Sequence, residues 1–162
     1  MRKIWMAMLL GAQVAAAEET GTAPASLVRQ AKGTFVALSV ADVAATSRWY
    51  HDKLGFRIVN QGDAPNKIAK FAVLESEGNI VEIVQHTQAR PLAQVAPAVK
   101  KTHEIHGIFK VGFHVGDIDA VYQAVKERGV AITYDFIQAK DIDLRTFIIR
   151  DNAGNLIQFF GK

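Results

Sequence analysis

The sequence predicts an α+β fold of two tandem units, each in the order strand, helix, strand, strand, strand. Three observations lead to this prediction: a weak internal repeat, the apolar alternation typical of half-buried strands, and Gly-Asn pairs that mark turns between neighbouring strands. The length of 162 residues suits one domain with a hydrophobic core. Hydrophobic residues make up 49% of the chain and the mean hydropathy is +0.08, as in a globular protein.

The repeat is clearest where each unit begins. Residues 35–43 align with residues 110–118, at an offset of 75 (110 minus 35). Both segments alternate apolar side chains on one parity, as a half-buried strand does. Each then reaches an aspartate, Asp42 or Asp117, that is expected to cap a helix rather than act in catalysis.

A helix is expected after each of these aspartates. The first covers residues 43–54 and the second residues 118–128. Gly55 and Gly129 follow them, and glycine just past the last turn is a typical helix stop. The remaining strands are expected at residues 56–59, 68–74, 78–84, 130–133, 145–150 and 154–160.

The N-terminus has the layout of a secretory signal peptide over residues 1–17. Arg2 and Lys3 form a basic start, a short apolar run follows, and small residues at 15–17 precede Glu18. The chain is therefore expected to be exported, periplasmic or secreted, with no membrane anchor after cleavage. The alternative is a frayed N-terminal helix on a cytosolic protein.

The charge and the cysteine content of the sequence limit the classes of partner and chemistry that are expected. Removal of Arg2 and Lys3 leaves 17 basic residues against 16 acidic ones, a charge near +1. No basic run with interleaved aromatic residues is present, so a nucleic-acid partner is not expected. The absence of cysteine from the sequence excludes a lipoprotein anchor, a disulfide framework and a thiol nucleophile.

Two segments carry a resemblance to a known family. Residues 42–56, with Trp49-Tyr50 and Leu54-Gly55-Phe56, and residues 150–158 resemble the vicinal oxygen chelate (VOC) superfamily, the glyoxalase and bleomycin-resistance fold. The resemblance covers residues 33 to 160 and implies a curved mixed sheet around a cavity. The expected organisation is a flexible leader at 18–31 and a single VOC domain at 32–162, with unit one at 33–86, a linker at 87–105 and unit two at 106–162.

In that family a divalent metal is commonly held by histidine, glutamate or glutamine from the first and last strands of each unit. The matching positions here are Phe35, Glu82, Lys110 and Gln158. Phenylalanine cannot ligate a metal and a protonated lysine has no lone pair, so no cofactor is predicted. A rearranged divalent-metal site made of Glu82, Gln158, His114 and His86 stays open as an alternative.

The residues that share these strand faces predict an apolar cavity with a few polar groups. The expected ligand-binding residues are Phe35, Glu82, Lys110, His114 and Gln158. Lys110 is expected to take the place of the metal, to pair with Glu82 and to receive an anionic or carbonyl oxygen. The alternatives are a purely structural pair, or a Lys110 side chain that reaches to the rim.

Three functions remain open on the sequence alone. The first is metal-independent binding of a small, partly apolar or anionic molecule. The second is a glyoxalase-type lyase or isomerase that uses the rearranged metal site, or uses Lys110 as an electrostatic stabiliser. The third is a homodimeric interaction module with a filled cavity. His103 and His106 are expected to be exposed linker histidines, because two histidines are only half a zinc site.

Overall fold

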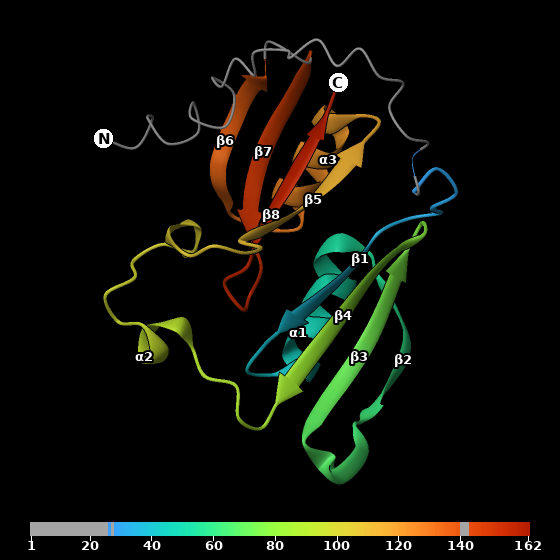
Figure 1. The fold of residues 1–162 in the computed structure, drawn as a ribbon. Coiled ribbons are helices and arrows are strands. Elements are labelled where there is room, and N and C mark those ends of the chain that lie inside the picture. Colours follow the sequence, from blue (N-terminus) through green and yellow to red (C-terminus); the bar gives the residue numbers. More distant parts are fainter. Residues whose placement is uncertain (1–25, 27, 140–142) are drawn as a thin grey trace.

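The computed structural model describes residue 26, residues 28–139 and residues 143–162 (Figure 1). The expected signal peptide and most of the expected leader lie outside these residues. The fold is α+β, with two four-stranded mixed sheets and a helix packed on each. Among the described residues, no helix has both the length and the hydrophobicity to cross a bilayer.

Unit one contains the first sheet. Its strand order is β1-β4-β3-β2, with β1 parallel to β4 and the other neighbours antiparallel. The elements are β1 (Phe35–Ser39), α1 (Val43–Trp49), η2 (Tyr50–Leu54), β2 (Arg57–Asp63), η3 (Pro65–Lys67), β3 (Ala69–Ser76) and β4 (Asn79–His86).

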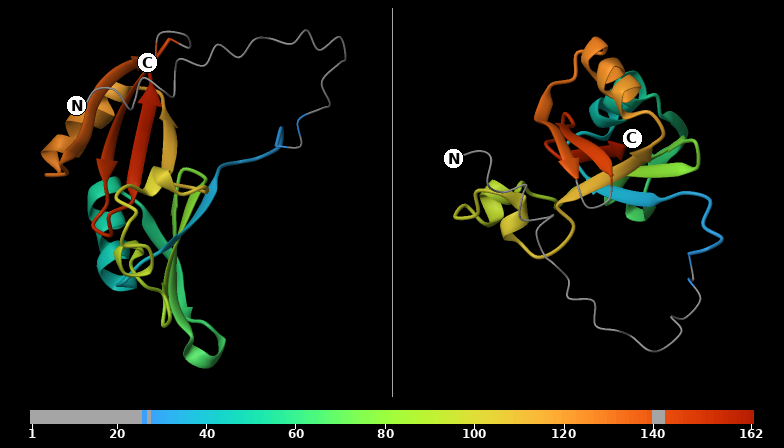
Figure 2. Two further views of the ribbon diagram at one scale, coloured as in Figure 1. Left: turned by 60° about the vertical axis from the view of Figure 1, so that its left-hand side comes forward. Right: turned by 90° about the horizontal axis from the view of Figure 1, so that it is seen from above.

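Unit two repeats this plan in the order β5-β8-β7-β6, with β5 parallel to β8. The elements are β5 (Lys110–Val115), α3 (Ile118–Glu127), β6 (Ile132–Ala139), β7 (Leu144–Arg150) and β8 (Leu156–Gly161). The linker holds two short helices, α2 (Leu92–Val95) and η4 (Thr102–Glu104). It projects to one side of the sheets (Figures 1 and 2).

The helix signals in the sequence are confirmed in both units. Asp42 accepts a hydrogen bond from the Ala45 amide and Asp117 one from the Ala120 amide, each at 2.9 Å. Gly55 (φ 79°) and Gly129 (φ 69°) end the helices in the left-handed conformation that glycine adopts without strain. The first helix differs from the expectation in one respect, because its last turn, η2, is a π-helix.

The predicted strands are all present, but two are longer than expected. β2 continues to Asp63 and β6 to Ala139, both of them edge strands with a shifted register that interrupts the apolar alternation. All of β2 is exposed, so hydrophobicity gives little signal there. Instead, β2 is held in place by main-chain pairing with β3, and β6 by main-chain pairing with β7.

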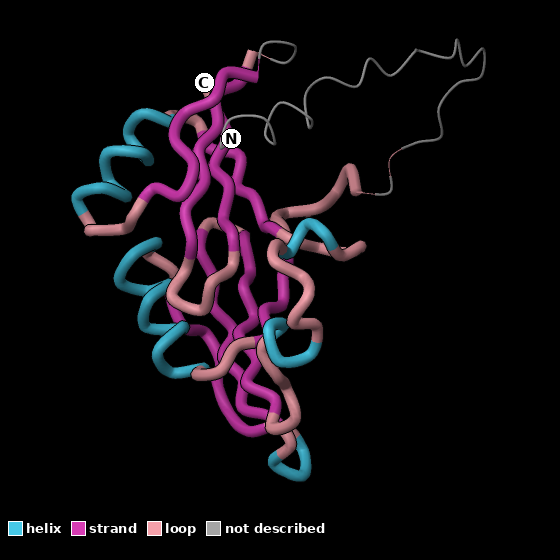
Figure 3. The backbone as a smooth tube through the Cα atoms, turned by 90° about the vertical axis from the view of Figure 1, so that its left-hand side faces the viewer, coloured by secondary structure: helices cyan, strands magenta, loops and turns pink. Residues whose placement is uncertain are grey.

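The hydrophobic core lies between the helices and the sheets. Both helices cover the same side of the strand layer (Figure 3). Alternate strand residues such as Leu38, Ile83, Phe147 and Ile157 face this side and are buried there. Tyr50 is fully buried, while Trp49 and Tyr122 are partly buried against the same core, between helix and sheet.

Side-chain contacts join the two units. The rings of Phe56 and Phe113 lie 6.0 Å apart between centroids, which makes the core continuous across the junction. The Tyr50 hydroxyl donates to the Asp151 carboxylate at 3.3 Å. Lys53 and Arg128, each at the C-terminal end of its helix, bond to one another's main-chain carbonyl. The junction therefore positions the sheets relative to each other.

Candidate functional site

The side of each sheet opposite the helix is the open face. The central row of this face in unit one is Ala37, Glu82 and Val73, which are register partners across β1, β4 and β3. The equivalent row in unit two is Gly112, Gln158 and Ile148 on β5, β8 and β7. Strand parity therefore places the predicted site residues on the open faces, as expected.

Lys110 lies at the start of β5 on the open face of unit two. Its side chain is partly buried, and this burial lowers the pKa of the ammonium group from its ordinary value. Its Nζ lies 5.3 Å from the centroid of the Phe109 ring, and His103 of η4 packs edge-on against that same ring. The linker thus forms part of the surroundings of Lys110.

The expected ion pair between Lys110 and Glu82 is not formed within the chain. The ion pairs among the described residues are Arg57–Glu75, Arg145–Asp119 and Lys162–Asp143. Strand parity correctly gave the face on which each side chain lies, but it carries no information on the distance between two sheets. Lys110 and Glu82 belong to different sheets, and each lacks an oppositely charged partner in the part of the chain that is described.

Gln158 is held in one orientation. The Thr146 hydroxyl donates to the Phe159 carbonyl at 2.7 Å, so its oxygen accepts from the Gln158 amide nitrogen, also at 2.7 Å. The Gln158 carbonyl oxygen is left with no partner among the described residues. Thr146 was not among the predicted site residues, and the one signal for it was a hydroxyl residue directly before the apolar run Phe147-Ile148-Ile149.

Phe160 gives the open face of unit two an aromatic surface. A Cβ on Gly112 would lie 3.0 Å from the Phe160 ring, so only glycine lets the ring lie this close to β5. The His114 ring is exposed and packs edge-on against Phe160, at 5.4 Å between centroids. On unit one, Phe35 is 64% exposed and presents an apolar surface to solvent.

These residues do not fit the metal centre that the fold family implies. Phe35 and Lys110 cannot ligate a divalent ion, and the amide nitrogen of Gln158 is directed at Thr146. The rearranged set of Glu82, Gln158, His114 and His86 does not come together either. In the described parts of the chain, no three histidine, aspartate or glutamate side chains lie close enough to hold an ion.

The two linker histidines differ from the expectation of two exposed side chains. His106 is exposed, but His103 is partly buried against Phe109. His86 accepts a hydrogen bond from the Gln88 amide at 3.1 Å and ends β4. None of these three histidines faces another across a site.

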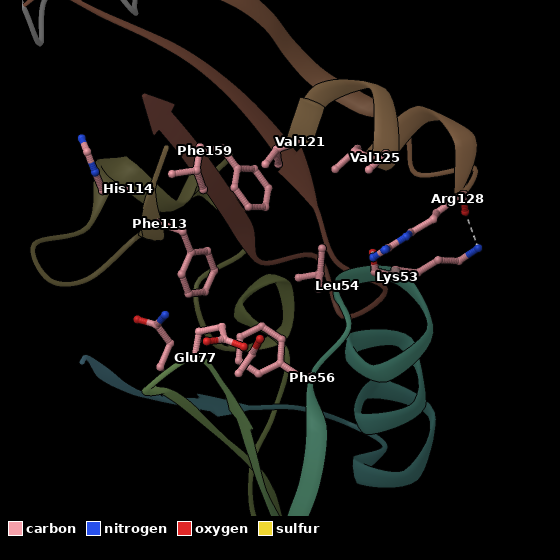
Figure 4. Close-up of a pocket in the computed structure, with 14 residues that line it drawn as sticks. Lys53, Leu54, Phe56, Glu77, Phe113, His114, Val121, Val125, Arg128 and Phe159 are labelled. Atoms are coloured by element: carbon pink, nitrogen blue, oxygen red, sulfur yellow. Dashed lines mark hydrogen bonds between the residues drawn. The ribbon is translucent and has the colours of Figure 1, made fainter. Parts of the chain in front are cut away.

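A cleft lies apart from the open faces, at the junction of the two units (Figure 4). It has a volume of about 370 Å³. Its walls come from η2, the turn between β3 and β4, strands β5 and β8, and helix α3. This cleft could not be predicted from local patterns, because its walls combine residues 53–79 of unit one with residues 113–159 of unit two.

Solved structures of similar fold come from several bacteria. A glyoxalase family protein from Enterococcus faecalis has a TM-score of 0.65 at 20% identity, over 78% of this chain and 94% of the other. A glyoxalase/bleomycin resistance protein/dioxygenase domain from Frankia sp. EAN1pec has a TM-score of 0.61 at 15% identity, with 87% and 93% covered. The lactoylglutathione lyase from Agrobacterium tumefaciens has a TM-score of 0.55 at 15% identity, with 79% and 91% covered.

At such identities the likeness extends to the fold alone. The comparison with curated protein sequences finds no match. The family model of the Glyoxalase/Bleomycin resistance protein/Dioxygenase superfamily matches residues 34–159, which is most of the chain. The matched region holds nearly all of both βαβββ units, so this chain belongs to the glyoxalase/bleomycin resistance/dioxygenase superfamily.

Proposed function

We propose that this protein binds a small, partly apolar anionic molecule on the open face, without the metal that is usual in the family. Lys110 is the observation that carries the proposal. It stands at a position where the family places a metal ligand, and it is partly buried with no acidic partner among the described residues. Burial removes part of the water that solvates this ammonium group. An anion that binds there replaces those interactions, so its binding is favourable.

The neighbouring groups suit the rest of such a ligand. Phe160 offers an aromatic surface, and the Gln158 carbonyl oxygen accepts one hydrogen bond from a ligand hydroxyl or amine. A mainly apolar surface with a few fixed polar groups is typical of small-molecule sites. The metal-dependent form of the lyase alternative has no corresponding support, since the described residues do not assemble a metal site.

A second copy of the chain completes this site in our proposal. Within the described parts of the chain, Glu82 lies on the open face of unit one without a cationic partner, and Lys110 lies on the open face of unit two without an anionic one. Phe35 and Ile108 are 64% and 90% exposed, which is unusual for large apolar side chains unless another surface covers them. A homodimer that places the open face of unit one against that of unit two would cover both and bring Glu82 near Lys110. The ammonium group has three N–H donors, so it can contact Glu82 and the ligand anion together.

A charge exchange tests the dimer. Glu82→Lys alone and Lys110→Glu alone place like charges together and should shift the protein towards monomer in analytical ultracentrifugation. The double variant restores opposite charges and should recover the dimer. If the wild-type chain sediments as a monomer at all concentrations, the dimer proposal is wrong.

Metal content and ligand binding test the function. The full chain is exposed to zinc, nickel, manganese and iron and then measured by elemental analysis, where the proposal expects no metal above background. The aromatic carboxylate 1-naphthoate is then titrated while the amide signals of Gly112 and Gln158 are followed by NMR. Both signals should shift in the wild-type protein, and Lys110→Met should weaken the affinity about tenfold.

Lys70→Met is the matched control, because it removes an exposed lysine of β3 that lies in the other unit. It should bind 1-naphthoate as the wild type does. One equivalent of metal that is lost in Glu82→Ala would overturn the metal-free proposal and favour a lyase or dioxygenase. Equal affinity of Lys110→Met and wild type would show that Lys110 does not contact the carboxylate.

We also propose export of the protein after cleavage before Glu18. The order of basic start, apolar run and small residues supports it. Mass spectrometry of the protein recovered from the periplasm or medium should give a chain that begins at Glu18. Recovery of the intact chain from the cytosol alone would contradict export.

A further inference from the structure

We propose that the cleft between the two units is a second ligand site, which binds an amphipathic carboxylate such as a medium-chain fatty acid anion. This site is separate from the open faces and does not depend on the function proposed above. Its volume of about 370 Å³ falls in the range of small-molecule sites. The argument rests on its apolar floor and on the charges at its edge.

The floor of the cleft is apolar and comes from both units. Leu54 and Phe56 contribute from unit one, and Phe113 and Phe159 from unit two. The rings of Phe113 and Phe159 lie 5.9 Å apart between centroids, and Phe56 lies 6.0 Å from Phe113. Val121 and Val125 of α3 form the wall above these rings (Figure 4). An alkyl chain that lies here loses contact with water along its length, which favours binding.

One edge of the cleft carries two basic residues, Lys53 and Arg128, whose side chains run antiparallel. The Lys53 ammonium donates to the Arg128 carbonyl at 2.5 Å, and the Arg128 guanidinium donates to the Lys53 carbonyl at 3.0 Å. Figure 4 shows the two side chains alongside one another, with the Arg128 guanidinium nearer Leu54 and the Lys53 ammonium at the outer end. Within the described residues neither has an acidic partner, and each keeps further N–H donors that these bonds do not use.

The charge balance at this edge favours an anion. Two helices end here, and the C-terminal end of a helix carries roughly half a negative charge. The two helix ends together offset about one of the two full positive charges, so a net charge of about +1 remains. Glu77 lies at another edge of the cleft, where Ser76 and Asn79 also lie. A carboxylate head group is thus directed to Lys53 and Arg128 and away from Glu77.

His114 also borders the cleft but belongs to the open face. Its ring packs against Phe160, and Figure 4 shows it at the far edge from the two cations. It therefore takes no part in the proposed contacts. A ligand in the cleft touches both units and would hold the junction together.

The experiment uses octanoate as the probe and the full chain as the protein. Calorimetry gives the affinity, and NMR shows the location through the amides of Leu54 and Ser76 in the cleft and Gly112 on the open face. The proposal expects Leu54 and Ser76 to shift and Gly112 to stay unchanged. The uncharged analogue 1-octanol should bind about tenfold more weakly, because it offers no charge to the two cations.

Variants test the two parts of the site. Lys53→Gln and Arg128→Gln keep an N–H donor and remove one charge, so each should weaken octanoate binding about tenfold. Lys126→Gln is the matched control on the same helix, since Lys126 lies over the Tyr122 ring and not in the cleft, and it should bind as the wild type does. Ala124→Leu fills the cleft from α3 without removing a contact, and it should abolish binding while the protein stays folded.

Three results would overturn the proposal. The first is no octanoate binding to the wild-type protein. The second is a shift of Gly112 in place of Leu54 and Ser76, which would assign the probe to the open face and leave that proposal intact. The third is equal affinity of Lys53→Gln, Arg128→Gln and Lys126→Gln.

Discussion

The two units hold the turn between their last two strands in different ways. In unit one, Glu77 and Gly78 form a tight turn with positive φ, and the Glu75 carboxylate accepts from the Gly78 amide at 3.0 Å. In unit two, a longer turn surrounds the buried carboxylate of Asp151. This carboxylate accepts bonds from the main-chain amides of Ala153 and Asn155, the Asn155 side chain and the Tyr50 hydroxyl.

The comparison shows that one backbone plan serves two purposes. The turn of unit one lies at the surface and forms a wall of the cleft, whereas the turn of unit two anchors that unit to the first helix of unit one. The same divergence appears on the open faces, where Glu82 has no partner among the described residues and its counterpart Gln158 is held by Thr146. The repeat thus preserves the positions of side chains while their chemistry differs.

The largest expected effect is a difference in stability between variants of the two turns. Asp151→Ala removes the acceptor of four hydrogen bonds at a buried site, and it should lower the free energy of unfolding by about 3 kcal/mol. Glu75→Ala should cause a clearly smaller loss. Urea unfolding followed by circular dichroism measures both, and equal losses would mean that the turns are held alike. Asp151→Asn, which keeps the shape, should lie between them.

A second prediction concerns the bond between Tyr50 and Asp151. Burial first, and then the charge of Asp151, raise the pKa of the Tyr50 phenol above its ordinary value. A group with a raised pKa contributes stability that is present below its unfolded pKa, about 10, and is lost as the pH rises further. Unfolding free energy should therefore fall above about pH 10, and Tyr50→Phe should flatten this part of the profile.

Absorbance at alkaline pH supplies the control. Tyr50 should ionise only when the protein unfolds, so its absorbance change should coincide with the loss of structure. If the profile of Tyr50→Phe matches that of the wild type above pH 10, then another group is responsible for the alkaline loss.

The helix caps should show where the two units are alike. Asp42→Ala and Asp117→Ala each remove one bond of 2.9 Å to the first turn of a helix, so each should cost about 1 kcal/mol. Equilibrium unfolding of the two variants measures the costs. A difference of more than a factor of two would mean that the surroundings of the two caps matter more than the shared geometry.

The smallest expected effect is on the stability of the folded chain when Lys110 is replaced. Burial lowers the pKa of its ammonium group, so the charged form destabilises the fold at neutral pH and this penalty fades as the pH rises towards the ordinary lysine value. Lys110→Met should raise the unfolding free energy of the monomer by no more than about 0.5 kcal/mol. Lys70→Met should leave it unchanged, and a loss of stability in Lys110→Met alone would point to an anionic partner.

Much of the fold could be predicted from the sequence because the signals are local. Asp42 and Asp117 mark helix starts, Gly55 and Gly129 mark helix ends, and the alternation in β1 and β5 gives the buried face. Edge strands were predicted too short, because their residues face water and are paired through the main chain alone. Residues 1–25 are not among the residues that the structure describes, so the signal peptide stays a prediction.

The site could be predicted only in part, because its geometry depends on contacts between the units. Lys110, Glu82 and Gln158 are on the predicted faces, but the pairing of Lys110 with Glu82 was wrong for the single chain. The bond from Tyr50 to Asp151 spans 101 residues and the bonds between Lys53 and Arg128 span 75. Periodicity describes one strand or helix at a time and gives no information on such pairs.

The pairing of β1 with β4 and of β5 with β8 has a consequence for the order of folding. Each sheet is complete within its own half of the chain, so neither half needs residues of the other to close its hydrogen-bond ladder. The entropic cost of loop closure thus arises within each half. We therefore expect the two halves to dock in a late step of folding. During synthesis, every strand of the first sheet is therefore available once unit one has left the ribosome.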